Sequence, residues 1–304
     1  MLSAAIDTYL KVRRALGFKL DKVQGYLTSY SDFATSQGDV YVRAQTAIQW
    51  AGLAASEASC VRRLDILIRF ALFAHADNSQ HEIPPTGVFC RRHRRREPYI
   101  FSDDEVQCIM RQARQLGPLN SLRPYTYSTL FGLLAATGLR ISEGLALRIS
   151  DITPDGILIR ETKFRKSRLV CMHDSVAVAL HQYLIRRSKV IGNDDHIFVS
   201  HRGGHRLHYH VVAETFRLVL DAAGINGTQG MPKPRLHDLR HRFAVKALLA
   251  CPDSRCKVTR HMLALTTYMG HAHVGSTYWY LDSTPQLMSD IANACEALLK
   301  GIEP

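Results

Sequence analysis

Apolar residues recur every three or four positions through the first 77 residues of the chain. This spacing follows one face of an α-helix, whose period is 3.6 residues. It predicts four short helices, with apolar stripes that begin at Ile6, Val23, Ala47 and Val61. Four short helices are enough for a small all-α domain. Periodicity alone does not distinguish a DNA-binding domain from a module that serves only packing.

The helical pattern breaks between residues 84 and 98. Two prolines and a glycine come first, and a dense basic run closed by Pro98 follows. Proline and glycine beside a run of like charges are typical of a linker. A charge run is often only a solvated segment, but five arginines within six residues between two domains favour contact with phosphates. These residues are Arg91, Arg92, Arg94, Arg95 and Arg96.

A second domain is predicted from residue 99 onward. Ser102 followed by Glu105 is a capping box at a helix start, and the apolar stretch from Tyr127 to Ala136 predicts a buried helix that ends at Gly138. After turn chemistry at 152–157, two apolar segments predict strands on either side of a basic tip. The strands are expected at 157–159 and 169–172, and further helices at 174–187, 209–222, 238–250, 258–268 and 285–299.

These elements predict a mostly α protein with a small antiparallel β-sheet. The expected organisation is an N-terminal helical domain at 1–83, a basic linker at 84–98 and a larger C-terminal domain at 99–304. A length of 304 residues fits two domains.

Charge and composition indicate which class of binding partner and which cellular location to expect. The net charge is +12, which favours a polyanion, with nucleic acid ahead of an anionic membrane surface. No run of eighteen apolar residues occurs, and the N-terminus lacks a basic segment followed by an apolar one, so we expect a cytoplasmic protein that neither spans a membrane nor is secreted. Seven scattered cysteines without a Cys-x-x-Cys pair indicate free thiols.

Two groups of residues raise the question of a metal site. Cys251, Cys256 and His261 are spaced five apart, which matches no usual zinc finger and leaves the fourth ligand unassigned. A second group, around Gly203-Gly204, contains the imidazoles of residues 201, 205, 208 and 210 without a nearby carboxylate or thiolate in sequence. A solvated or DNA-facing loop explains the second group better, so no metal and no cofactor is expected.

Short motifs carry the chemistry. The string Thr-Gly-Leu-Arg-Ile-Ser-Glu occupies 137–143, Leu-His-Asp-Leu-Arg-His-Arg-Phe-Ala occupies 236–244, Met-Gly-His occupies 269–271, and a tyrosine stands nine residues later. In this order, and over roughly residues 98–290, the motifs resemble the tyrosine recombinase (phage integrase) family. The resemblance implies an N-terminal core-binding domain and a C-terminal integrase-like catalytic domain.

The resemblance also implies the catalytic residues. Two arginines would grip the scissile phosphate, two histidines would assist, a lysine would act as general acid, and a tyrosine would be the nucleophile. These are Arg140, Arg240, His237, His271, Lys163 and Tyr280, with Glu143 supporting the fold around the site. The family implies DNA cleavage through a 3′-phosphotyrosine, without metal or ATP, by a homotetramer on double-stranded DNA.

Two assignments keep an alternative. The rivals of Tyr280 as nucleophile are Tyr278, two residues earlier, and Tyr268, three residues before His271. A tyrosine beside Trp279 is usually part of the core or of an interface, which fits Tyr278 better than Tyr280. Leu281-Asp282 departs from the Thr-His that often follows the family tyrosine. Alignment of Arg168-Leu169-Val170 with the family Arg-x-Val places Lys163 on the catalytic lysine, and Lys166 is the alternative because Phe164 stands where glycine is usual.

Further basic residues are expected to contact DNA. Besides the linker arginines they are Arg165, Lys166, Arg168, Arg202, Arg206 and Arg242, the last of which replaces a threonine of the family motif. Two other functions remain open: DNA relaxation of the type IB topoisomerase kind, and a catalytically inactive DNA-binding accessory factor. The Tyr-Trp-Tyr-Leu box resembles recombinases of mobile elements, for which integration, excision or transposition are the expected tasks.

Overall fold

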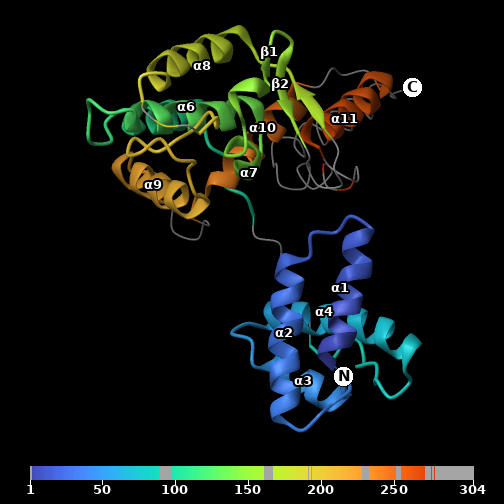
Figure 1. Ribbon diagram of the computed structural model, residues 1–304. Coiled ribbons are helices and arrows are strands. Elements are labelled where there is room, and N and C mark those ends of the chain that lie inside the picture. Colours follow the sequence, from blue (N-terminus) through green and yellow to red (C-terminus); the bar gives the residue numbers. More distant parts are fainter. Residues whose placement is uncertain are drawn as a thin grey trace, which may run out of the picture. The chain divides into compact units, whose positions relative to one another are not determined.

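The structure is a computed structural model (Figure 1). It describes residues 2–89, 97–160, 167–190, 192, 194–227, 233–250, 255–270, 275 and 277, with the side chains of 255–259 excepted. The chain divides into two compact units, Met1–Arg95 and Arg96–Pro304. Within the described residues, no helix is both long enough and apolar enough to cross a bilayer.

The first unit contains the four helices that the apolar periodicity predicts. They are α1 (Leu2–Ala15), α2 (Asp21–Ser36), α3 (Ala44–Gly52) and α4 (Glu57–Asp77). Its core is rich in aromatic rings that meet edge to face, with Tyr30 against Trp50 and Tyr9 against Phe70. The assignment of this unit as a DNA-binding domain stays a prediction.

The second unit is mostly helical, with one small sheet. Its helices are α5 (Asp103–Ala113), α6 (Arg123–Thr137), α7 (Ile141–Gly144), α8 (Asp174–Arg187), α9 (Tyr209–Ala222), α10 (Leu236–Leu249) and α11 (Arg255–Met269), with a 3₁₀ turn at Ile149–Asp151. The capping box is confirmed: Ser102 Oγ accepts from the Glu105 backbone N–H at 3.1 Å, and the Glu105 carboxylate accepts from that of Ser102 at 2.7 Å.

Helix α6 lies at the centre of the second unit. Helices α5, α8 and α10 pack against it, and Phe216 of α9 meets Phe131 at 5.0 Å between ring centroids. Because neighbours surround α6, its buried residues are spread around the helix instead of forming one stripe. The buried helix therefore ends at Gly138 in the middle of the unit, and this end positions the candidate site.

The sheet has three antiparallel strands in the order β1 (Ile152–Thr153), β2 (Gly156–Ile159) and β3 (Arg168–Val170). The two strands around the basic tip are confirmed, and β3 packs against α11. The segment interpreted as a turn at 152–157 also supplies the short strand β1, which pairs Ile152 with Ile157 across the turn. A two-residue strand is too short to show alternation in the sequence.

Candidate active site

The C-terminus of α6 places the first arginine. Gly138 ends the helix with φ of +62°, a left-handed conformation that favours glycine. A β-carbon at this position would overlap the ring of Phe243, so the glycine also makes room for α10. Arg140 follows in extended conformation, immediately before the short helix α7.

The carboxylate of Glu143 joins two guanidiniums. Arg140 donates to it from Nη1 at 2.8 Å and from its backbone N–H at 3.0 Å. Arg168, from strand β3, donates to both carboxylate oxygens, at 3.0 and 2.8 Å. Burial alone would raise the pKa of Glu143, but the hydrogen bonds from Arg168 and Arg140 outweigh it and hold the pKa at about 2. Glu143 is therefore an ionised bridge at neutral pH.

Arg240 lies on the first turns of α10 and is 2% exposed. Its Nη1 donates to the carbonyl oxygen of Gly138 at 2.5 Å, and its Nη2 donates to that of Met269 at 2.6 Å. One guanidinium thus links the ends of two helices that lie far apart in sequence, α6 and α11.

Three guanidiniums converge on the carboxyl end of α11. Arg168 Nε donates to the carbonyl of Tyr268 at 2.8 Å, and Arg240 to that of Met269. Arg140 Nη2 donates to the carbonyl of Gly270 at 3.0 Å. The last carbonyls of a helix lack intrahelical donors and carry partial negative charge, so they attract cations. This end of α11 leads directly to position 271.

Gly270 is required by this packing. Its φ is +64°, and a β-carbon here would lie 2.8 Å from Nη1 of Arg168. A larger residue would therefore be strained by its backbone and would also push the guanidinium away. The close contact with Arg168 therefore explains why the Gly-His motif has a glycine at this position.

His237 lies on the first turn of α10, with its side chain open to solvent and its ring 4.6 Å from that of His241. Partial desolvation and the positive charges of the nearby arginines together lower its pKa to about 4; these arginines are Arg240, Arg235 and Arg140. The imidazole is therefore neutral at neutral pH and can accept a proton.

The match to a known family decides the identity of the chain. A model of the phage integrase family matches residues 100–286, and the putative integrase/recombinase y4rB of Sinorhizobium fredii is 34% identical over 303 residues, covering 96% of each chain. The chain belongs to the phage integrase family. It is a tyrosine recombinase, an enzyme of site-specific DNA recombination. The tyrosine recombinase XerD of Caulobacter vibrioides is 28% identical over 230 residues, covering 74% of this chain and 70% of the relative.

Solved integrase structures share the fold. The Tn1549 transposon integrase in complex with transposon right end DNA has a TM-score of 0.64 at 16% identity and covers 95% of this chain and 99% of its own. A lambda integrase dimer bound to a core site has a TM-score of 0.61 at 18% identity and covers 93% and 96%. At these identities the likeness concerns the fold alone.

Four of the expected phage integrase site residues, Arg140, Glu143, His237 and Arg240, lie together in the structure. The remaining expected catalytic residues lie outside the described residues, as do the linker arginines and part of the hairpin tip. These are Lys163, His271 and Tyr280, the alternatives Lys166 and Tyr278, and Arg165, Arg91, Arg92, Arg94, Arg95 and Arg96. Their roles stay predictions.

The sequence did not indicate what Arg168 and Phe243 do in this phage integrase site. Arg168 is expected to contact DNA, but its Nε, Nη1 and Nη2 all donate to protein oxygens of Tyr268 and Glu143. Phe243 stacks on Tyr268 with ring centroids 5.4 Å apart, beneath Gly138. The available signal in the sequence was the alignment of Arg168 with the arginine of the family Arg-x-Val, which does not indicate its contacts. Its expected contact with DNA stays untested.

The other expected DNA contacts differ in exposure. Arg202 is exposed on its loop. Arg242 is 8% exposed and forms an ion pair with Asp103 at the start of α5, and Lys246 donates to the same carboxylate at 2.8 Å. This pair ties α10 to the first residue of α5, close to where the chain enters the catalytic unit.

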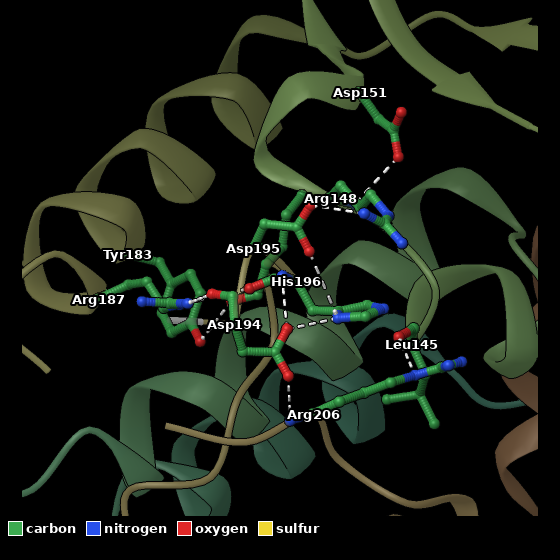
Figure 2. Close-up of polar contacts among 10 residues, drawn as sticks. Leu145, Arg148, Asp151, Tyr183, Arg187, Asp194, Asp195, His196 and Arg206 are labelled. Atoms are coloured by element: carbon green, nitrogen blue, oxygen red, sulfur yellow. Dashed lines mark hydrogen bonds and ion pairs between the residues drawn. The ribbon is translucent and has the colours of Figure 1, made fainter. Parts of the chain in front are cut away.

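A separate polar cluster holds the chain after α7 against the loop before α9 (Figure 2). Arg206 donates from Nε to the carbonyl of Leu145 at 3.1 Å and from its backbone N–H to Asp194 at 2.8 Å. Arg148 donates to Asp195 at 2.7 Å. These contacts fix the position of α7, which carries Glu143.

The same cluster contains a possible set of metal ligands. Ligand atoms of Asp194, Asp195 and His196 lie within 4.8 Å of one another. Burial raises the pKa of Asp194, but hydrogen bonds from His196 and the Arg206 backbone lower it to about 2. Because these carboxylates already accept from arginine, histidine and backbone donors, we assign them to the fold and place no metal there.

Proposed function

We propose that this recombinase exchanges DNA strands through a covalent 3′-phosphotyrosine intermediate. The observation that carries the proposal is the meeting of Arg140 and Arg240 at the end of α11, beside a neutral His237 and directly before position 271. Arg140, just before α7, and Arg240, on α10, bring two positive charges to one place, which suits the binding of one phosphate.

The two arginines would meet the phosphate differently. The Arg140 side chain is 32% exposed, so it offers an open face to a phosphodiester, whereas Arg240 is almost fully buried. Arg240 would therefore act mainly through its fixed charge and through the Gly138 and Met269 carbonyls that hold it. Preorganised charge of this kind is typically worth several kcal/mol in a transition state, here for the pentavalent phosphorane.

The chemical step is assigned from the family resemblance. A free phenol has a pKa of ~10 and needs to lose its proton to attack. Tyr280 attacks the phosphorus while His237 accepts its proton, and the bond between phosphorus and the 5′ oxygen breaks. Lys163, or its alternative Lys166, gives a proton to the departing 5′ oxygen, and His271 donates a hydrogen bond to a non-bridging oxygen.

The intermediate keeps the phosphodiester energy in the bond to tyrosine. The 5′-hydroxyl of another strand can attack that bond, restore the backbone and release the phenol, so the proposal routes no step through a metal or ATP. Strand exchange needs two duplexes that are cut on both strands, hence four protomers. Lambda integrase, which shares the fold, forms a tetramer bound to a Holliday junction.

A suicide substrate tests the proposal. A nick near the scissile phosphate makes the fragment that carries the released 5′-hydroxyl short enough to diffuse away. Without that hydroxyl, religation cannot occur, and the protein stays attached to the 3′ phosphate. The expected result is a covalent adduct that resists denaturant, and strand transfer between two labelled duplexes in the presence of intact sites. Relaxation of supercoiled DNA without transfer between duplexes would favour the topoisomerase activity, and binding without adduct would favour the accessory factor.

A further inference from the structure

Arg168 has an environment unlike that of a DNA contact. It is the first residue of β3, its side chain is 11% exposed, and it donates to the carbonyl of Tyr268 and to both oxygens of Glu143. Its guanidinium also packs against Gly270, at the position a side chain would take. The arginine thus touches the strand hairpin, the Glu143 motif and the end of α11 together.

We propose that Arg168 is a positioning residue for recombination: it fixes the carboxyl end of α11 against the Glu143–Arg140 pair. This inference rests on the proposed function, because it matters for catalysis only if Arg140 binds the scissile phosphate. Through Glu143, Arg168 orients the Arg140 guanidinium. Through Tyr268, it holds the segment that leads to position 271.

The geometry needs an arginine. A lysine ammonium is a point donor, which can reach one oxygen of Glu143 or the Tyr268 carbonyl but does not present the fixed fork that spans all three acceptors. Since Glu143 is 9% exposed at its side chain, the loss of Arg168 would leave its carboxylate with Arg140 as the remaining guanidinium partner among the described residues. The pKa of Glu143 would then rise from about 2, because burial opposes its charge.

The neighbouring titratable groups do not mask this change. Among the residues that the structure describes, the charged side chains that contact Glu143 are Arg140 from the start of α7 and Arg168 from β3. Beside these arginines stand His237, with a pKa of about 4, and Tyr268, with a pKa of about 12. Among these described groups, Glu143 is therefore the one whose protonation we expect to differ between variant and parent from pH 5 to 8.5.

The experiment compares three variants of the full chain. Arg168→Gln removes the charge, and Arg168→Lys keeps it without the fork. Arg160→Gln is the matched control. Arg160 follows β2 and donates to the buried carboxylate of Asp151, in the 3₁₀ turn, at 2.5 Å, and its recorded contact among the described residues is with neither Glu143 nor α11. The measurements are DNA affinity against salt, the cleavage rate on a suicide substrate against pH, and hydrogen exchange in the last turn of α11.

For Arg168→Gln we expect unchanged affinity and salt dependence, a cleavage rate at least ~10-fold lower at pH 6, and partial recovery as the pH rises. Exchange in the last turn of α11 should be faster, Arg168→Lys should be intermediate, and the control should match the parent. A tenfold rate loss corresponds to about 1.4 kcal/mol. If Arg168→Gln does not fold, the same pH-dependent deficit is expected from Arg168→Lys.

Two results would overturn the inference. One is a salt dependence shallower by ~0.9, the amount that one lost phosphate contact removes, which would make Arg168 a DNA contact. The other is a ratio of variant to parent rate that does not change with pH. If the parent forms no adduct, the proposed function fails. The ¹³C-detected carboxyl pKa of Glu143 in DNA-free protein, raised by Arg168→Gln and not by Arg160→Gln, still tests the link to Arg168.

Discussion

The ring of Phe243 fills the space that a side chain on Gly138 would occupy. The same ring stacks on Tyr268, 5.4 Å between centroids. Gly138 lies two residues before Arg140, Phe243 three residues after Arg240, and Tyr268 three residues before His271. One aromatic side chain of the second motif therefore packs against the first motif and against the residue before the third.

This contact predicts a strong steric coupling. Gly138→Ala should destabilise the chain more than Gly224→Ala, because both glycines have positive φ but nothing lies within 4 Å of a β-carbon at Gly224. Backbone strain accounts for about 1–3 kcal/mol in each variant. Phe243→Ala should cost about 2–4 kcal/mol. In a denaturant-unfolding cycle, Gly138→Ala should cost less in the Phe243→Ala background, and strict additivity would contradict the contact.

The low pKa of His237 predicts a neutral imidazole in mildly acidic solution. In an NMR titration of histidine-labelled, DNA-free protein, His237 should stay unprotonated at pH 5.5, and Arg235→Gln should raise its pKa. The folded pKa lies below the ordinary 6.5, so the unfolded chain takes up the proton first and stability falls as the pH drops from about 6.5 towards 4. A measured pKa near 6.5 would remove the charge-based reason for a general base.

The basic linker predicts a steep salt dependence of DNA binding. The slope of log K for DNA binding against log [salt] steepens by about 0.9 for each phosphate contact. Replacement of the arginine run by glutamine should therefore make this slope shallower. The residues to replace are Arg91, Arg92, Arg94, Arg95 and Arg96. Fluorescence anisotropy at several salt concentrations measures the slope, and an unchanged value would mean that the run is only a solvated linker.

A substrate whose leaving group needs no proton can identify the general acid. Lys163→Ala should cleave ordinary DNA poorly and recover on a substrate with a 5′-bridging phosphorothiolate, whose thiolate leaves without a proton. Arg140→Ala and Arg240→Ala should not recover to the same degree, since their charges act on the non-bridging oxygens. Recovery by Lys166→Ala instead would move the acid three residues along the hairpin. Equal failure of Lys163→Ala on both substrates would leave Lys163 as a DNA contact only.

Local patterns predicted most of the described fold. Helices α8 and α9 have the predicted bounds of 174–187 and 209–222, because each has a clear apolar face between turn residues. The carboxyl end of α6 and the capping box at Ser102 also follow from nearby residues alone, whereas α6 begins at Arg123, before the predicted stretch from Tyr127. Strand β1 was not predicted, because its two residues form a strand only through their pairing with β2.

The sequence predicted the site residues that lie within recognisable motifs. It did not predict the role of residues that depends on packing between distant segments. Sequence places Arg140, Glu143, His237 and Arg240 in recognisable strings. The role of Arg168 depends on contacts 25 and 100 residues away along the chain, which no local pattern reveals. On sequence alone it is one more cation of a basic hairpin.

The nucleophile is the central claim, and a pair of tyrosine variants tests it most directly. On the suicide substrate, Tyr280→Phe should bind DNA with the affinity of the parent and form no covalent adduct, because the attacking phenolic oxygen is gone. Tyr278→Phe, which keeps Tyr280, should form the adduct. Adduct from Tyr280→Phe together with none from Tyr278→Phe would contradict the assignment and shift the motif by two residues, and adduct from both would contradict tyrosine attack at this motif altogether.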